Sequence, residues 1–180
     1  LPGYTNSISA IAEGHHHTCA LTTAGAVRCF GYSWNNNLTP GITSGAVDIS
    51  AGYLHSCALM SYGGVKCWGR NDSGGQLGDG TNTNRIAAVD VLGLTSGVTA
   101  ITTGHESSCA LLSTGAVKCW GWNGYGQLGD GTTTNRNVPT QVSGITSGAV
   151  AIAAGQNHTC ALLATGDVKC WGLNNYGQIG

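Results

Sequence analysis

The sequence predicts an all-β fold built from four copies of one hairpin. Each copy places two cysteines on either side of a short glycine-containing centre, and all eight cysteines of the chain lie in these copies. Self-similarity of this kind marks a repeat architecture. Glycine makes up 30 of the 180 residues, which suits a fold with many tight turns. The copies read HTCALTTAGAVRCFG from His17, HSCALMSYGGVKCWG from His55, SSCALLSTGAVKCWG from Ser107 and HTCALLATGDVKCWG from His158.

The first copy predicts an antiparallel hairpin with a three-residue loop. If Cys19 faces Cys29 across the ladder, the loop is Thr23-Ala24-Gly25. Loops of this length commonly end in a left-handed residue, a conformation that costs glycine nothing. The same loop position holds a glycine in all four copies, namely Gly25, Gly63, Gly115 and Gly166. The pairing also brings the two cysteines within the span of a disulfide.

The cysteine spacing favours disulfides over a metal site. Structural zinc ligands usually come as close pairs separated by two to four residues, and no such pair occurs here. Four disulfides imply an oxidising compartment, so we expect an extracellular protein, secreted or at the cell surface. The expected pairs are Cys19 with Cys29, Cys57 with Cys67, Cys109 with Cys119, and Cys160 with Cys170.

Composition excludes several functions. Only 8% of the residues are charged and the formal net charge is −1, which leaves no basic footprint for nucleic acid and no polybasic segment for a membrane surface. No apolar run reaches the length of a membrane span. The acidic residues are scattered without a repeated carboxylate pair, so we expect no enzyme and no cofactor. The adjacent histidines His15, His16 and His17 are weak evidence for a metal site, and none is assigned.

The repeats resemble those of the regulator of chromosome condensation family. The resemblance rests on a repeat histidine, on an aromatic-glycine pair after the second cysteine, and on the phrase GQLG in the following loop. It covers nearly the whole chain and implies a β-propeller of about four blades, in the manner of the secreted bacterial members of the family. We treat residues 1–180 as one array, with hairpins near 15–31, 53–69, 105–121 and 156–172. The matching aromatics are Trp68, Trp120 and Trp171, with Phe30 as their substitute in the first copy, and the matching histidines are His17, His55 and His158.

Four blades leave the array open unless neighbouring chains complete it. Family propellers usually have seven blades, and exposed terminal blades are templates for association. A second copy placed after Gly180 would continue the cysteine series at nearly the spacing of the short internal repeat. The leading hypothesis is therefore a non-enzymatic extracellular scaffold that joins copies head to tail, as a ring or a fibre. An equally weighted alternative is that the sequence is a piece of a longer, closed propeller.

A competing hypothesis is a propeller module that binds a protein or a glycan through its loops. Aromatic loop residues often anchor such contacts, although they also pack between blades. The candidates are Trp34, Trp122, Tyr125 and Tyr176. Three Asn-x-Ser/Thr motifs mark candidate glycosylation sites at Asn37, Asn71 and Asn157, the last of them close to an expected strand.

Overall fold

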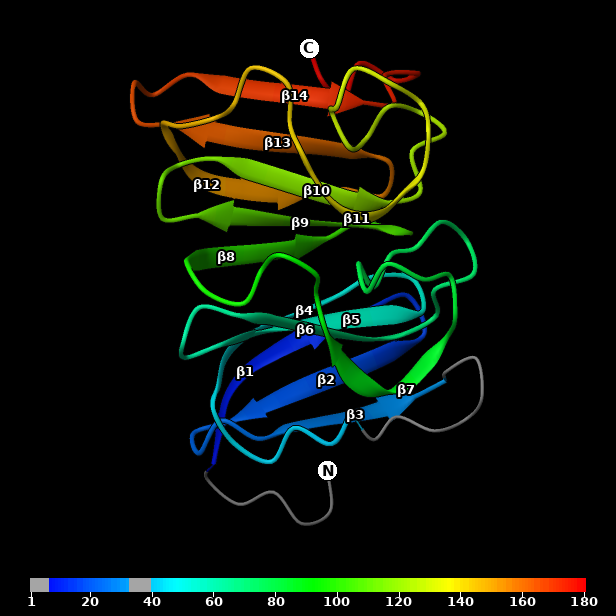
Figure 1. Cartoon of the computed structure of the whole chain (residues 1–180), viewed down its shortest axis with the longest axis vertical. Helices are drawn as coiled ribbons and strands as arrows, with labels where there is room; N and C mark the ends of the chain where they lie inside the picture. Colours follow the sequence, from blue (N-terminus) through cyan, green and yellow to red (C-terminus); the bar gives the residue numbers. More distant parts are fainter. Residues whose placement is uncertain (1–6, 33–39) are drawn as a thin grey trace.

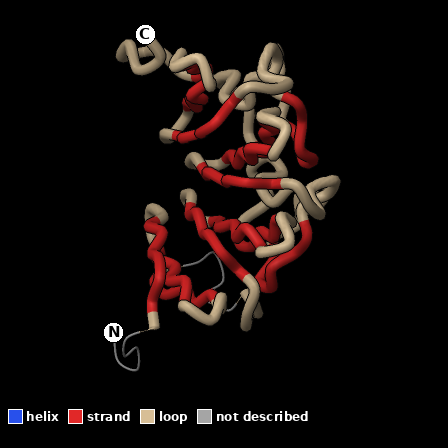
Figure 2. The backbone as a smooth tube through the Cα atoms, turned by 90° about the vertical axis from the view of Figure 1, so that its left-hand side faces the viewer, coloured by secondary structure: helices blue, strands red, loops and turns tan. Residues whose placement is uncertain are grey.

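The computed structural model describes residues 7–32 and 40–180, and this part of the chain contains strands and loops but no helix. The strands form four antiparallel sheets in the orders β1-β2-β3, β4-β5-β6-β7, β11-β10-β9-β8 and β12-β13-β14. Each sheet is one blade, numbered 1 to 4 along the chain (Figure 1). Blades 1 and 4 lie at opposite ends of the long axis, and the sheets fan out without closing into a ring (Figure 2). The all-β prediction and the four open blades are confirmed.

The strand bounds repeat from blade to blade. Blade 1 has β1 (Ile8–Glu13), β2 (His17–Thr22) and β3 (Val27–Gly31); blade 2 has β4 (Ala46–Ala51), β5 (His55–Met60), β6 (Val65–Gly69) and β7 (Arg85–Asp90). Blade 3 has β8 (Val98–Thr103), β9 (Ser107–Leu112), β10 (Val117–Gly121) and β11 (Arg136–Gln141); blade 4 has β12 (Ala149–Ala154), β13 (His158–Leu163) and β14 (Val168–Gly172). No described helix is long and apolar enough to cross a membrane.

Each blade carries the predicted disulfide. The second and third strands pair so that the two cysteines face each other, as Cys19 faces Cys29, with Cα atoms 4.0–4.1 Å apart in all four blades. Gly25 closes the first loop with its amide bonded to the Thr22 carbonyl and a φ of 77°, the left-handed conformation that the sequence predicted. The four disulfides account for every cysteine and indicate a non-cytoplasmic setting.

The first strand of each blade lies against the first strand of the next, so β1, β4, β8 and β12 form the inner edge of the array. Backbone bonds link these blades in series: the His15 amide donates to the Gly52 carbonyl over 3.2 Å, and the Tyr53 amide donates to the His105 carbonyl over 2.9 Å. A Cβ on Gly14 would stand only 2.5 Å from the Gly52 oxygen. Gly52 and Gly104 approach the next blade in the same way, so the glycine that follows β1, β4 and β8 is required for the blades to lie this close.

The hydrophobic core lies between blades rather than within them. Three clusters fill the three internal seams, and each combines the disulfide face of one blade with the isoleucine and tryptophan face of the next. In the middle seam Val65 and Cys67 of blade 2 pack with Ile101 and Trp120 of blade 3. We call the Leu, Val and Cys face of each blade its trailing face, and the Ile and Trp face its leading face. Every internal seam joins a trailing face to a leading face.

Candidate functional site: the seams and the open blade faces

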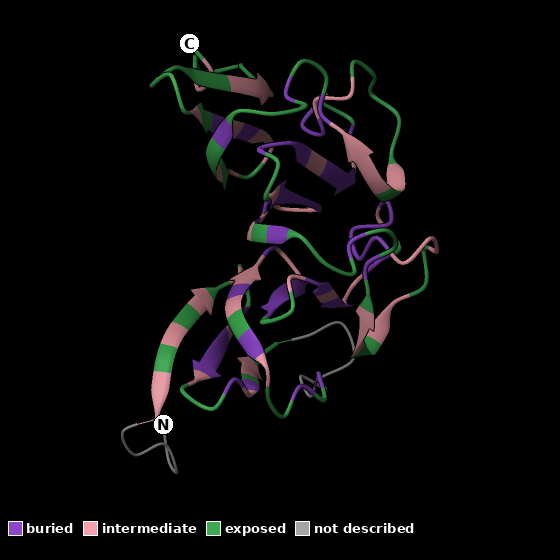
Figure 3. Cartoon of the chain, turned by 60° about the vertical axis from the view of Figure 1, so that its left-hand side comes forward, coloured by how far each residue is buried: buried purple, intermediate pink, exposed green. Residues whose placement is uncertain are grey.

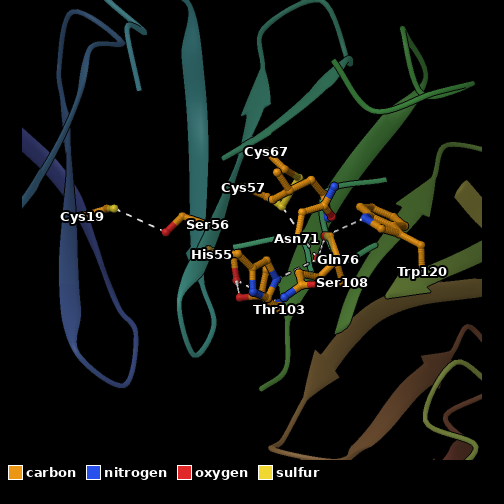
Figure 4. The surroundings of a disulfide bond; sticks show 12 residues. Cys19, His55, Ser56, Cys57, Cys67, Asn71, Gln76, Thr103, Ser108 and Trp120 are labelled. Atoms are coloured by element: carbon orange, nitrogen blue, oxygen red, sulfur yellow. Dashed lines mark hydrogen bonds between the residues drawn. A yellow bond between two sulfur atoms is a disulfide. The ribbon is translucent and has the colours of Figure 1, made fainter. Parts of the chain in front are cut away.

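Two of the three internal seams, between blades 2 and 3 and between blades 3 and 4, are each held by one carbonyl oxygen that accepts two hydrogen bonds. Gln76, in the GQLG loop of blade 2, accepts hydrogen bonds from Trp120 Nε1 and from Ser108 Oγ of blade 3, both over 3.0 Å (Figure 4). In the next seam the Gln127 carbonyl accepts from Trp171 Nε1 and Thr159 Oγ1 over 2.9 and 3.1 Å. The repeated glutamine and tryptophan are thus two halves of one contact between neighbouring blades.

The repeat histidine also crosses the seam. His17 Nε2 lies 2.6 Å from Ser56 Oγ, and His55 Nε2 lies 3.0 Å from Ser108 Oγ. Both imidazoles are buried. Burial, with a smaller contribution from His16, lowers the pKa of His17; burial, with contributions from His17 and His105, lowers the pKa of His55 to about 3. Both rings are therefore neutral near pH 7 and link neighbouring blades by hydrogen bonds.

The loop of residues 79–84 in blade 2, which reads DGTNTN, is stabilised by hydrogen bonds among its own side chains and backbone. Asp79 accepts hydrogen bonds from the Thr81 amide and hydroxyl over 2.9 and 2.7 Å, and its other oxygen pairs with Arg85 Nε over 2.9 Å. Partial burial alone would raise the pKa of Asp79, but these donors outweigh it and hold the pKa below its ordinary value. Asp130, Thr132 and Arg136 repeat the arrangement in blade 3. The carboxylate is therefore occupied by protein donors.

Asn71 lies at the centre of that loop. Its side chain is fully buried, and Nδ2 lies within 2.9–3.2 Å of the Asp79 carboxylate and of the Thr81 and Thr83 carbonyls. A glycan on this nitrogen is incompatible with the folded blade. The motif at Asn157 lies in the half-buried β12–β13 turn and remains a prediction, while the motif at Asn37 falls outside the described residues.

The predicted loop aromatics do not form one group. Trp122 packs edge-on against Tyr125, with ring centroids 5.1 Å apart, and Tyr125 is exposed. Tyr176 follows blade 4 and is 93% exposed. Trp34 falls outside the described residues. Loop binding through these side chains therefore stays a prediction.

The trailing face of blade 4 is open. Val168 is 63% exposed, whereas the equivalent Val27, Val65 and Val117 of blades 1 to 3 are at most 1% exposed. Leu162 follows the same trend: it is 39% exposed, whereas the equivalent Leu21, Leu59 and Leu111 are at most 6% exposed. Figure 3 shows this contrast as the change from purple internal strands to the pink and green of β14.

The leading face of blade 1 is also exposed, because no described blade packs against it. Ile11 is 63% exposed, whereas the equivalent Ile49 and Ile101 are 7% and 9% exposed because each packs on the blade before it. Phe30 stands where the other blades have tryptophan and is half-buried. The two ends of the array thus present the two partners of an ordinary seam.

A separate cluster of rings lies at one end of the inner edge. His15, Tyr53 and His105 occupy the same position in blades 1, 2 and 3, directly after the inner-strand glycine, and line a cavity of about 270 Å³. Tyr53 stacks on His105 with ring centroids 4.1 Å apart, and His15 meets Tyr53 edge-on at 5.0 Å. Sequence reasoning missed this cluster because the residue type changes between blades. The signal that could have revealed it is that a ring-bearing residue directly follows Gly14, Gly52 and Gly104, the glycines after the inner strands.

Beside this cluster lies a groove of about 550 Å³ lined by His16, Tyr32, Tyr53, Leu54 and Arg70. Arg70 does not offer a free cation there, because its guanidinium pairs with Asp72 and with Glu106. Glu106 also accepts a hydrogen bond from Ser73 Oγ over 2.7 Å.

These features define an open β-propeller segment with a disulfide in every blade. Sequence profiles of the regulator of chromosome condensation (RCC1) repeat match residues 46–74, 98–127 and 149–178, and a second profile of the same repeat matches residues 114–162. Together they cover more than half of the chain. The chain belongs to the RCC1 repeat family.

Among curated proteins, the X-linked retinitis pigmentosa GTPase regulator homolog of Caenorhabditis elegans is 40% identical over 82 residues, which are 44% of this chain and 6% of that protein. The ultraviolet-B receptor UVR8 of Arabidopsis thaliana is 31% identical over 109 residues, 59% of this chain and 24% of the receptor. The human E3 ubiquitin-protein ligase HERC2 is 36% identical over 108 residues, 59% of this chain and 2% of the ligase. The chain therefore spans at most about a quarter of these relatives.

Solved structures agree on the fold. Human WBSCR16 superposes with a TM-score of 0.81 at 21% identity, over 96% of this chain and 50% of that one. Prp20p of Saccharomyces cerevisiae superposes with a TM-score of 0.80 at 20% identity, over 99% of this chain and 48% of that one.

Proposed function

We propose that this chain is a non-enzymatic extracellular scaffold that joins copies head to tail, with the trailing face of blade 4 of one copy on the leading face of blade 1 of the next. One observation carries the proposal. The valine position that is buried in all three internal seams, at Val27, Val65 and Val117, is exposed in blade 4, at Val168. Fully burying a Val or Leu side chain is worth about 1.5–3 kcal/mol, so this face favours a partner blade.

Blade 1 of a second copy offers the groups that blade 4 lacks. Internal seams pair the repeat histidine with a hydroxyl of the next blade, so His158 would meet Thr18 of the second copy. Ile179 corresponds to Leu77 and Leu128, which both end in the core of the following seam. The tryptophan contact is missing, because Phe30 has no N–H to donate, and blade 4 has three described strands where blades 2 and 3 have four. The seam between copies is then weaker than an internal one, and association is reversible.

The relatives support a role in protein binding. One related structure is yeast RCC1 (Prp20) bound to Kap60, and another is titled for the binding of Prp20p to Gsp1p and histones. Those partners belong to those proteins. For the present chain the open faces favour a blade of its own kind, and the disulfides favour assembly outside the cytoplasm.

Replacing Val168 with Asp is expected to abolish association without unfolding the chain. In a lone copy the side chain is exposed, whereas in the seam the carboxylate would be buried without a partner. The measurement is sedimentation velocity over a concentration series, with the wild type expected to gain mass and Val168→Asp expected to stay monomeric.

Val150 supplies a matched control. It is 54% exposed, but the equivalent Val47 of an internal blade is equally exposed at 55%, so this position lies outside the seams. Val150→Asp should associate as the wild type does. A wild type that stays monomeric at high concentration, or equal effects of both substitutions, would refute the proposal.

A further inference from the structure

Three histidines, His15, His16 and His105, lie close together at the inner edge although they come from two different blades. His15 and His16 lie in the turn between β1 and β2 and are both exposed, whereas His17, the next residue, turns into the seam and is buried. His15 Nδ1 lies 3.1 Å from His16 Nε2. His105 arrives from the β8–β9 turn of blade 3, with its ring centroid 6.5 Å from that of His15.

The separation of the two nitrogens suits a shared metal ion. Zinc–imidazole bonds are about 2.0–2.1 Å long, and adjacent ligands at angles between square and tetrahedral then place their nitrogens about 2.8–3.4 Å apart. The His15 and His16 nitrogens already have this spacing, held in the absence of metal by their mutual hydrogen bond. Imidazole is a preferred ligand of zinc, copper and nickel.

The surrounding charges favour a cation over an anion. Arg70 is the basic residue lining the adjacent groove, and the two carboxylates of Asp72 and Glu106 more than neutralise it. Glu13 lines the same cavity as His15 and adds a further negative charge.

We propose that His15 and His16 chelate one divalent late transition metal ion, with zinc or copper as the best fit, and that His105 joins them by rotating away from Tyr53. No three metal-ligating side chains converge in the part of the chain that the structure describes. The pair is therefore the preformed part of the site, and the third ligand is recruited from another blade. Water completes the coordination.

The test is isothermal titration of the untagged, disulfide-intact protein with zinc chloride, repeated with copper(II) chloride. We expect one ion per chain with micromolar affinity. His15→Gln and His16→Gln should each weaken binding at least about tenfold, and His105→Asn should have a smaller effect. All three side chains are exposed or half-buried, so the variants should keep the wild-type circular dichroism spectrum.

His158→Gln is the matched control, because this histidine lies in the β12–β13 hairpin of blade 4 and should leave metal binding unchanged. Magnesium should not compete, since it prefers oxygen ligands. Wild-type affinity in either His15→Gln or His16→Gln would overturn the proposal, as would absence of zinc and copper binding up to about 1 mM. Bound metal per chain is read directly, so the result does not depend on whether copies associate.

Discussion

Lowering the pH from about 7 to about 4.5 should cost this protein roughly 2–3 kcal/mol of unfolding free energy through His55 alone. Burial, with contributions from His17 and His105, lowers the pKa of His55 from 6.5 to about 3. Between those values the unfolded chain binds a proton that the folded chain does not, so stability present above pH 6.5 falls by about 1.4 kcal/mol per pH unit. His17, whose pKa is also lowered, adds to the loss.

The measurement is chemical denaturation of the non-reduced protein at a series of pH values. Asp79 and Asp130 also have lowered pKa values, but their stabilising contribution is lost only below the ordinary value of 3.8, outside this range. His55→Asn should be less stable at pH 7 and show a flatter pH dependence, whereas exposed His16→Asn should keep the wild-type slope. An unchanged slope in His55→Asn would contradict the assignment.

Replacing Asn123 with Ala should cost about 3–5 kcal/mol. Its buried amide lies 3.0 Å from the Thr132 and Thr134 carbonyls and 3.2 Å from Asp130, and its oxygen accepts from the Leu128 amide over 3.0 Å. Removing the amide leaves the buried Leu128 amide and three partly buried acceptors without this partner, at a cost of about 1–3 kcal/mol for a fully buried group and less for a partly buried one. Denaturant unfolding under non-reducing conditions measures the loss.

Asn174 is the natural control for this prediction. It occupies the same repeat position in blade 4, and its oxygen also accepts from a backbone amide, that of Ile179 over 3.1 Å, but its side chain is exposed. Asn174→Ala should cost less than about 1 kcal/mol. Equal costs at the two positions would show that the network around Asn123 does not stabilise the blade.

The hairpins were predictable because two independent signals agree on their register. The cysteines fix which residues face each other, and the glycine at the left-handed loop position fixes the loop length, as at Gly25. The seams were only half predictable. The tryptophans and glutamines repeat visibly, but sequence periodicity does not show that Trp120 donates to the carbonyl of Gln76 in the preceding blade.

At Asn71 the glycosylation motif suggested an exposed site, whereas the side chain is buried and holds a loop together. Asn71 matches a glycosylation motif, yet its side chain closes a loop by bonding to Asp79 and to the Thr81 and Thr83 carbonyls. The inner-edge cluster was missed for the opposite reason. His15 and His105 come from different blades, and only the three-dimensional repeat brings them together around Tyr53.

Mixing two variants that block opposite faces tests the head-to-tail account most directly. Val168→Asp blocks the trailing face of blade 4, and Ile11→Asp blocks the leading face of blade 1, where the side chain is 63% exposed. Each variant keeps the face that the other has lost. Sedimentation velocity should find each variant monomeric alone and a one-to-one dimer in the mixture that grows no further. A mixture that stays monomeric, or a variant that associates alone, would contradict assembly through the open faces.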